Sequence, residues 1–157
     1  MKHYFFELCG GIDLPDEFKT GFHFYSVICD KFARPFAIYL IRPNGSFLSF
    51  KSFVYDVGPR VEVGSLRIER GSEIGLQETP KSLPEEFHKG VRYFSLNIKI
   101  ECCEIESGIA IVSESGEELA IYPGEMPFSI HVRSKFFTDN FKPEFILSDY
   151  VRIDPKL

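Results

Sequence analysis

Short runs of alternating apolar and polar residues, separated by glycine and proline, recur along the chain. Because successive side chains of a β-strand point to opposite faces, this alternation predicts strands with one buried face. In the longest run, residues 91–105, Phe94, Leu96, Ile98 and Ile100 are expected to point into the core together. We predict about nine strands in all. The runs fall within residues 4–8, 22–29, 36–42, 46–55, 61–70, 91–105, 109–113, 119–122, 128–133 and 144–153.

Turn-forming residues separate most of these runs. Asn44-Gly45 gives the strongest hairpin signal, and it predicts a two-residue type I′ turn with both residues at positive φ. Gly64-Ser65 shifts the alternation within 61–70 and suggests a β-bulge there. Helix signals occur at residues 82–90, SLPEEFHKG, where Ser82 is a possible cap and only one or two turns are supported.

The pattern as a whole predicts a single all-β domain spanning residues 1–157. Strands with almost no helix between them favour an antiparallel β-sandwich, jelly-roll-like, over alternating strands and helices, and at most one short helix is expected. A chain of 157 residues fits one core, and no linker, repeat or low-complexity tract divides it.

Composition agrees with a folded β protein. The chain is 44% hydrophobic and 26% charged, which argues against disorder, and its 17 Phe and 7 Tyr favour strands. The net charge of −5 disfavours direct binding to nucleic acid, which requires a basic face. The N-terminal apolar run is too short for a signal or a spanning segment, so we expect a cytoplasmic protein without a membrane partner.

No pattern of residues typical of catalysis stands out. The chain has no nucleophile elbow or phosphate-binding loop, and its histidines and cysteines lack metal-ligand spacing, so we expect no catalytic residues, metal ligands or cofactor. The cysteines are expected to be reduced thiols. These isolated residues are His3, His23, His88, His131, Cys9, Cys29, Cys102 and Cys103.

Seven glutamates fall between Lys99 and Met126 with no basic residue among them. They have two readings: charged turns that discourage pairing between sheet edges, or an anionic face for a basic protein partner. In either case the turn residues Glu114, Glu117, Glu118 and Glu125 should be exposed, while Ile109, Ile111, Leu119 and Ile121 face inward. The candidate partner-binding residues are Glu101, Glu104, Glu106, Glu114, Glu117, Glu118 and Glu125.

Residues 106–134 also carry a resemblance. Gly108, Ile109 and Ser113, followed by the proline-glycine turn Pro123-Gly124 with Phe128 and Ile130, resemble the C-terminal part of the competence-protein nuclease inhibitors related to ComJ. This sequence lengthens the turn with Glu125-Met126-Pro127, and its N-terminal half shows no match. The resemblance implies a β-sandwich that binds and blocks a nuclease, without catalytic residues to carry over.

The leading hypothesis is therefore a non-enzymatic protein-binding module, such as an inhibitor or immunity protein for a nuclease or other basic toxin. An alternative is a small-ligand or carbohydrate-binding sandwich in which Tyr25, Tyr39 or Tyr93 forms a stacking platform. A third is a metal-dependent enzyme whose His and Glu ligands come from distant strands. A toxin gene next to this one would distinguish the first from the others.

Overall fold

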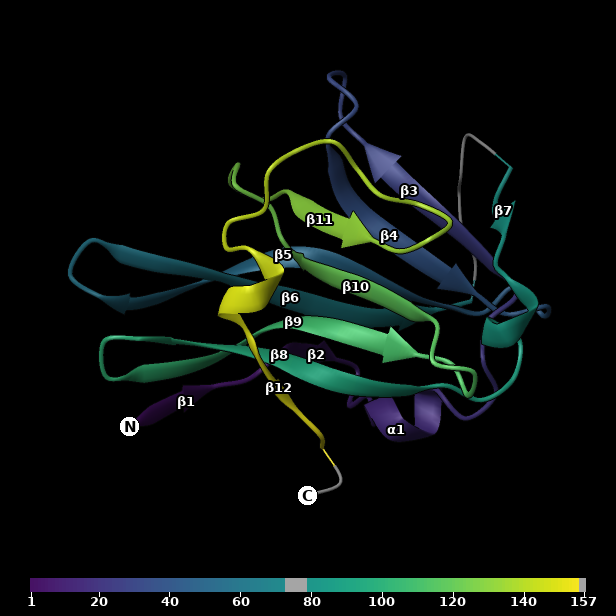
Figure 1. Ribbon diagram of the computed structural model, residues 1–157, viewed down its shortest axis with the longest axis horizontal. Coiled ribbons are helices and arrows are strands. Elements are labelled where there is room, and N and C mark those ends of the chain that lie inside the picture. The colour runs from purple at the N-terminus through teal and green to yellow at the C-terminus, as the bar shows by residue number, and fades with distance from the viewer. Residues whose placement is uncertain (73–78, 156–157) are drawn as a thin grey trace.

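Two β-sheets packed face to face make up the protein (Figure 1). The computed structural model describes residues 1–72 and 79–155. Each sheet has six strands, so the predicted all-β class is confirmed with more strands than expected. Within the described residues no helix is both long and apolar enough to cross a membrane.

Sheet A contains the strand order β11-β10-β9-β8-β12, with β1 paired to β9 off this path. The chain forms β8 to β11 in succession, so most neighbours are joined as antiparallel hairpins. The strands are β1 (Lys2–Tyr4), β8 (Arg92–Ile100), β9 (Cys103–Val112), β10 (Glu118–Pro123), β11 (Ile130–Arg133) and β12 (Val151–Ile153).

Sheet B has the order β2-β6-β5-β4-β3-β7, again with consecutive antiparallel neighbours from β3 to β6. Both sheets are therefore built mainly as meanders, whereas a jelly roll is built from two Greek keys. The strands are β2 (Glu7–Cys9), β3 (Phe24–Cys29), β4 (Pro35–Ile41), β5 (Phe47–Gly58), β6 (Val61–Gly71) and β7 (Lys81–Ser82).

The N-terminal segment connects the two sheets. The single strand predicted for residues 4–8 is wrong, because the chain changes sheets within it. β1 pairs in parallel with β9, and β2 pairs in parallel with β6. Phe6 lies between these strands and is buried, and its N–H donates to a carboxylate oxygen of Glu106 at 3.0 Å. We call residues 2–9 the N-terminal strap.

Helical structure is sparse, as expected, and only part of it lies where the sequence predicts it. Residues 82–90 form a single 3₁₀ turn, Glu85–Phe87. The one α-helix of the described residues, α1 (Leu14–Glu17), has proline in its first turn together with two acidic side chains, both of which favour a helix start. In place of a strand over 144–153, a 3₁₀ turn at Leu147–Asp149 precedes β12.

The β4–β5 turn differs from the predicted type I′ turn. Gly45 has φ of +89°, as expected, but Asn44 is not among the residues at positive φ. Pro43 has no N–H, so it cannot close the strand ladder, and the closing pair is Arg42 with Ser46. The loop is therefore a three-residue turn that ends in a left-handed glycine.

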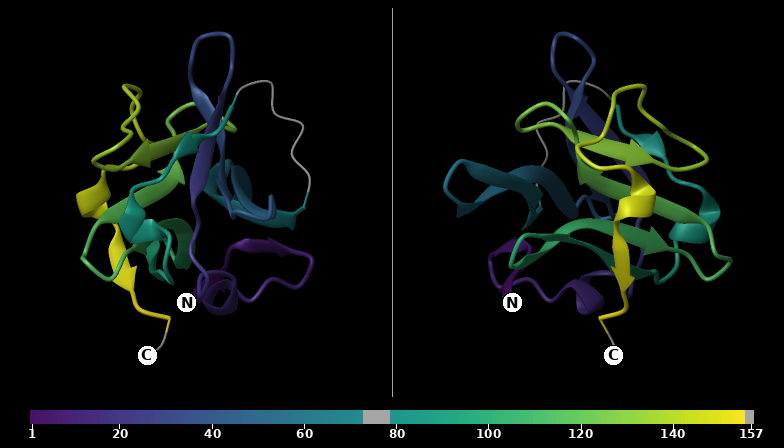
Figure 2. Two further views of the ribbon diagram at one scale, coloured as in Figure 1. Left: turned by 90° about the vertical axis from the view of Figure 1, so that its right-hand side faces the viewer. Right: turned by 60° about the vertical axis from the view of Figure 1, so that its left-hand side comes forward.

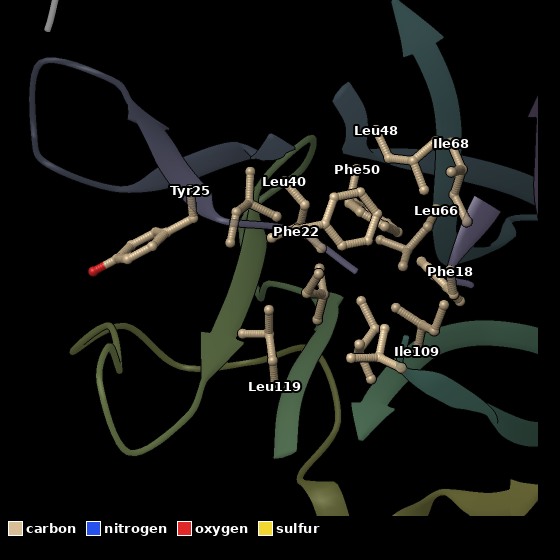
Figure 3. Close-up of a cluster of buried hydrophobic side chains, with 14 of the residues drawn as sticks. Phe18, Phe22, Tyr25, Leu40, Leu48, Phe50, Leu66, Ile68, Ile109 and Leu119 are labelled. Atoms are coloured by element: carbon tan, nitrogen blue, oxygen red, sulfur yellow. The ribbon is translucent and has the colours of Figure 1, made fainter. Parts of the chain in front are cut away.

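The main hydrophobic core lies between the sheets (Figure 3). Sheet B contributes Leu40, Phe50 and Leu66 among others, and Phe18 and Phe22, which lie between α1 and β3, enter the same cluster. From sheet A, the four residues that the alternation predicted to face inward all enter this core, which confirms that prediction. They are Ile109, Ile111, Leu119 and Ile121.

A second cluster covers the opposite face of sheet A. Leu96 and Ile98 are buried there, with Phe94 and Ile100 half-buried beside them, so these four side chains do share one face. The C-terminal segment contributes Tyr150 to this cluster. Since Tyr93 packs on the main core from the other face, sheet A is covered on both sides.

The two sheets meet where β6 passes β9. The hydroxyl of Ser107 donates to the carbonyl oxygen of Gly64 at 2.7 Å, and the hydroxyl of Ser65 donates to that of Glu106 at 2.6 Å. Ser107 is the extra residue of a bulge in β9. The bulge predicted at Gly64-Ser65 is wrong, because β6 pairs with β5 without interruption there.

Gly64 has no room for a side chain at this junction. A Cβ atom would lie 2.6 Å from Oε2 of Glu144 and 2.7 Å from Cβ of Pro123. We expect Gly64→Ala to lower the free energy of unfolding by about 1–3 kcal/mol, because the crowded strands must separate. Denaturation in urea measures this loss.

Gly58→Ala is the matched control on β5. Its Cβ would meet nothing closer than Oε2 of Glu101 at 3.9 Å, so its stability should stay within about 0.5 kcal/mol of the wild type. Equal stability of the two variants would contradict the crowding at the junction.

Candidate functional site

The seven candidate glutamates do not form one face. Glu101 lies in the turn before β9 and Glu114 in the turn after it. The ten residues of β9 span roughly 33 Å between these turns. Glu125 follows β10, in the turn to β11. The acidic run of the sequence is therefore distributed over several parts of the surface.

Two of the glutamates hold the N-terminal strap. Oε2 of Glu104 lies 3.0 Å from Nδ1 of His3. Glu106 is largely buried and accepts the N–H of Phe6. Burial raises the pKa of the Glu106 carboxyl, while hydrogen bonds from Phe6 and Ser95 act in the opposite direction. Both residues have structural partners within the chain.

Two more glutamates are half-buried, so the prediction that they are exposed is wrong. Glu117 accepts a hydrogen bond from Nζ of Lys135 at 3.0 Å. Both carboxylate oxygens of Glu118 bind the guanidinium of Arg152, with one contact at 2.8 Å. Lys135 follows β11 and Arg152 lies in β12, so both cations come from outside the acidic run. Only Glu101, Glu114 and Glu125 remain exposed.

The histidines do not assemble a metal site within the described residues, where no three His, Cys, Asp or Glu side chains could hold an ion. His131 lies 3.0 Å from Asp139, and both side chains are buried. However, the Asp139 carboxylate also accepts the backbone N–H groups of Val132 and Phe141, at 2.7 and 3.0 Å. This aspartate therefore fixes the 134–141 loop against β11.

The proposed tyrosine platform is not formed. Tyr25 is buried, and Tyr93 packs on the main core, where burial raises its pKa to about 12. Tyr39 lies against Phe47, with 5.1 Å between ring centroids. The three rings thus have different surroundings and do not present one open surface.

Large apolar side chains are instead exposed around one end of the sandwich. Three separate segments bring them there: the β3–β4 turn, the β10–β11 turn and residues 139–143 (Figures 1 and 2). Between these segments lies a hollow of about 340 Å³, which Pro35, Met126, Ile130 and Phe141 help to line. We call this surface the apolar tip. Its exposed apolar residues are Phe32, Phe36, Met126, Phe128 and Phe141.

Phe128 is the most exposed of these residues, at 71%, and its φ is +64°. A left-handed backbone costs a residue with a side chain about 1–2 kcal/mol. The turn holds it in place, because the N–H and the hydroxyl of Ser129 both donate to the carbonyl oxygen of Met126. Strain of this kind is found mainly where a function requires it.

A rigid turn also presents Phe32. The Asp30 carboxylate accepts the N–H groups of Phe32 and Arg34, at 2.8 and 3.0 Å. The hydrogen bond from the Arg34 backbone is the main cause that lowers the pKa of Asp30. The cations of Lys31 and Arg34 lie 5.1 and 5.2 Å from the Phe32 ring centre. Ala33, at φ of +63°, completes the turn.

Sequence reasoning did not identify the apolar tip. The pattern places Phe36 and Phe128 in strands 36–42 and 128–133; β4 does include Phe36, whereas Phe128 lies in the turn before β11. The available signal was Met126-Pro127 beside Gly124, an apolar residue inside a turn sequence, where polar residues are the norm.

Comparisons of the chain with family models, with curated proteins and with solved structures found no significant match. The resemblance to ComJ-related inhibitors therefore stays a prediction, and the functional argument depends on the residues of this chain.

The raised pKa of Glu106 predicts a pH-dependent stability. Between the ordinary value of 4.5 and the raised one, the folded state binds a proton that the unfolded state lacks, so stability falls as pH rises. Glu106→Gln keeps an acceptor for Phe6 and cannot ionise. We expect its stability relative to the wild type to increase from pH 4 to pH 7 in urea denaturation. Glu114→Gln, in an exposed turn, should follow the wild type, and a parallel pH profile for Glu106→Gln would contradict the argument.

The strain at Phe128 predicts a stabilising substitution. Asparagine tolerates the left-handed region, so Phe128→Asn should raise the free energy of unfolding by about 1 kcal/mol. Phe5→Asn is the control, because Phe5 is 64% exposed and is not at positive φ. Thermal unfolding of both variants measures the difference, and a Phe128→Asn variant less stable than Phe5→Asn would refute the strain.

Proposed function

We propose that the chain is a non-enzymatic protein-binding module and that it docks on its partner through the apolar tip. The observation that carries this proposal is a hollow lined by the exposed side chains of Met126 and Phe141, with Phe32, Phe36 and Phe128 exposed on the segments that border it. A soluble protein gains nothing for its own stability from such exposure, and contiguous exposed apolar surface is typical of interaction sites.

The charges of the apolar tip favour a protein partner over a lipid surface. Lys31, Arg34 and Lys142 are balanced in part by Asp30 and Glu125. Attraction to an anionic membrane uses clusters of about four to eight basic residues without such acids. A hollow lined by Met126, Ile130 and Phe141 fits a protruding apolar side chain of the partner, and buried aromatic contacts supply most of the energy of many protein interfaces.

An inhibitor or immunity protein is the narrower form of this proposal. The turns that present Phe32 and Phe128 are held by backbone hydrogen bonds, so little conformational entropy is lost on binding. Glu125 lines the hollow and is exposed, and it offers a carboxylate to a basic group on a nuclease or toxin. Of the predicted acidic residues, it is the one positioned to act with the apolar tip.

The test compares Phe128→Asn with Phe5→Asn. A photo-crosslinking amino acid placed at position 128, and at position 5 as a control, is used in cells of the source organism, and the adduct is identified by mass spectrometry. The identified partner is then purified and its affinity for each variant is measured by calorimetry. Because Phe128→Asn is expected to be more stable than the wild type, weaker binding by this variant cannot come from unfolding.

We expect Phe128→Asn to weaken partner binding at least about tenfold, as loss of a central aromatic contact does, and Phe5→Asn to change it less than twofold. Equal binding by both variants would refute the role of the apolar tip. Two other results would also refute the proposal: sedimentation of the wild type with anionic vesicles but no protein adduct, or an adduct that contains only a second copy of this chain.

A further inference from the structure

A second surface, separate from the apolar tip, lies where β10, β11 and the C-terminal segment meet. Two adjoining open hollows of about 660 and 690 Å³ share Arg133 and Leu147 as lining residues. No residue that lines them also lines the hollow of the apolar tip. We call the two together the charged groove. Its charged residues are Glu117, Glu118, Arg133, Lys135 and Arg152.

The charges of the groove are not balanced. Lys135 pairs with Glu117, and Arg152 pairs with Glu118. Arg133 has no ion-pair partner among the described residues, although the hydroxyl of Tyr122 is within its hydrogen-bonding reach. One guanidinium with free donors therefore stands in an open groove that has two further cations beside it.

The position of Arg133 explains why its guanidinium is available to bind a ligand. Its strand partner on β10 is Ala120, which is too short to reach the guanidinium. The nearby carboxylate of Glu118 is held by the two terminal nitrogens of Arg152, so it is already occupied. A carboxylate or phosphate group offers the planar, two-point acceptor that arginine binds best.

We propose that the charged groove binds a small hydroxylated organic anion, with its phosphate or carboxylate group on Arg133 and beside Arg152. The rest of the groove supports a hydroxylated body over a charged one, because it is lined by the hydroxyl residues Ser115, Thr138 and Ser148. The hydroxyls of Ser115 and Thr138 also bond within the chain, to the Ser113 hydroxyl and the Ser134 carbonyl oxygen, and each keeps a lone pair that can accept a ligand hydroxyl. Glu117 and Glu118 disfavour a second anionic group, so the ligand carries its charge at one end.

The test titrates four probes into isotope-labelled wild-type protein while amide signals are recorded by NMR. Glucose 6-phosphate and gluconate are hydroxylated anions with a phosphate or a carboxylate, inorganic phosphate lacks the body, and glucose lacks the charge. We expect saturable shifts confined to residues 115–118, 131–138 and 146–152 with at least one of the two hydroxylated anions, weaker binding of inorganic phosphate, and none with glucose.

Arg133→Gln should weaken that binding at least about tenfold, because a charge-assisted hydrogen bond is lost. Its side chain is exposed and the glutamine amide keeps a donor for the Tyr122 hydroxyl, so the thermal stability should change little. Arg92→Gln is the control, since Arg92 is exposed on β8 and lines neither hollow. Equal affinity in Arg133→Gln and the wild type, or shifts that never saturate, would overturn the proposal.

Discussion

Two serine hydroxyls determine how the sheets of this protein meet. Packed sheets normally lie about 10 Å apart because side chains fill the space between them. Here Ser65 and Ser107 each donate to a backbone carbonyl of the opposite sheet, which requires the strands to approach closely. Gly64 lies at this approach and has no side chain to collide with Pro123 on β10 or with Glu144.

The junction also covers the parts of β6 and β9 that lack a strand partner on one side. β2 pairs with β6 only at Arg67–Glu69, so the preceding part of β6 has a neighbour on one side only. On β9, residues 106–108 lie between the part paired with β1 and the part paired with β10. Side chains take the place of strand partners in both gaps. Glu144 contributes to this by accepting the N–H of Gly64 at 3.3 Å.

The alternation in the sequence predicted those features of the fold that depend only on residues close together in the chain. Alternation located β3 to β6, β10 and β11, and it correctly oriented Ile109, Ile111, Leu119 and Ile121, because the period of a strand needs no knowledge of its partner. The single run predicted over 91–105 is wrong, because the chain turns at residues 101–102 and residues 103–105 begin β9. It failed where the partner is distant in sequence. Lys135 and Arg152 neutralise Glu117 and Glu118 from 18 and 34 residues away, which no inspection of the acidic run reveals. The left-handed conformation of Phe128 runs against its own propensity, so only the folded turn discloses it.

The N-terminal strap has a consequence for synthesis of the chain on the ribosome. Its two strands need partners at residues 67–69 and 103–105, which are synthesised after it, so the strap is among the last segments to find its place. Translation adds about 5–20 residues per second, so the segment waits for several seconds with Phe6, which is buried in the folded protein, still in water. During that interval the nascent chain offers a short apolar strand to any chaperone or neighbouring polypeptide. The sandwich is closed only when β9 has left the ribosome and receives the strap.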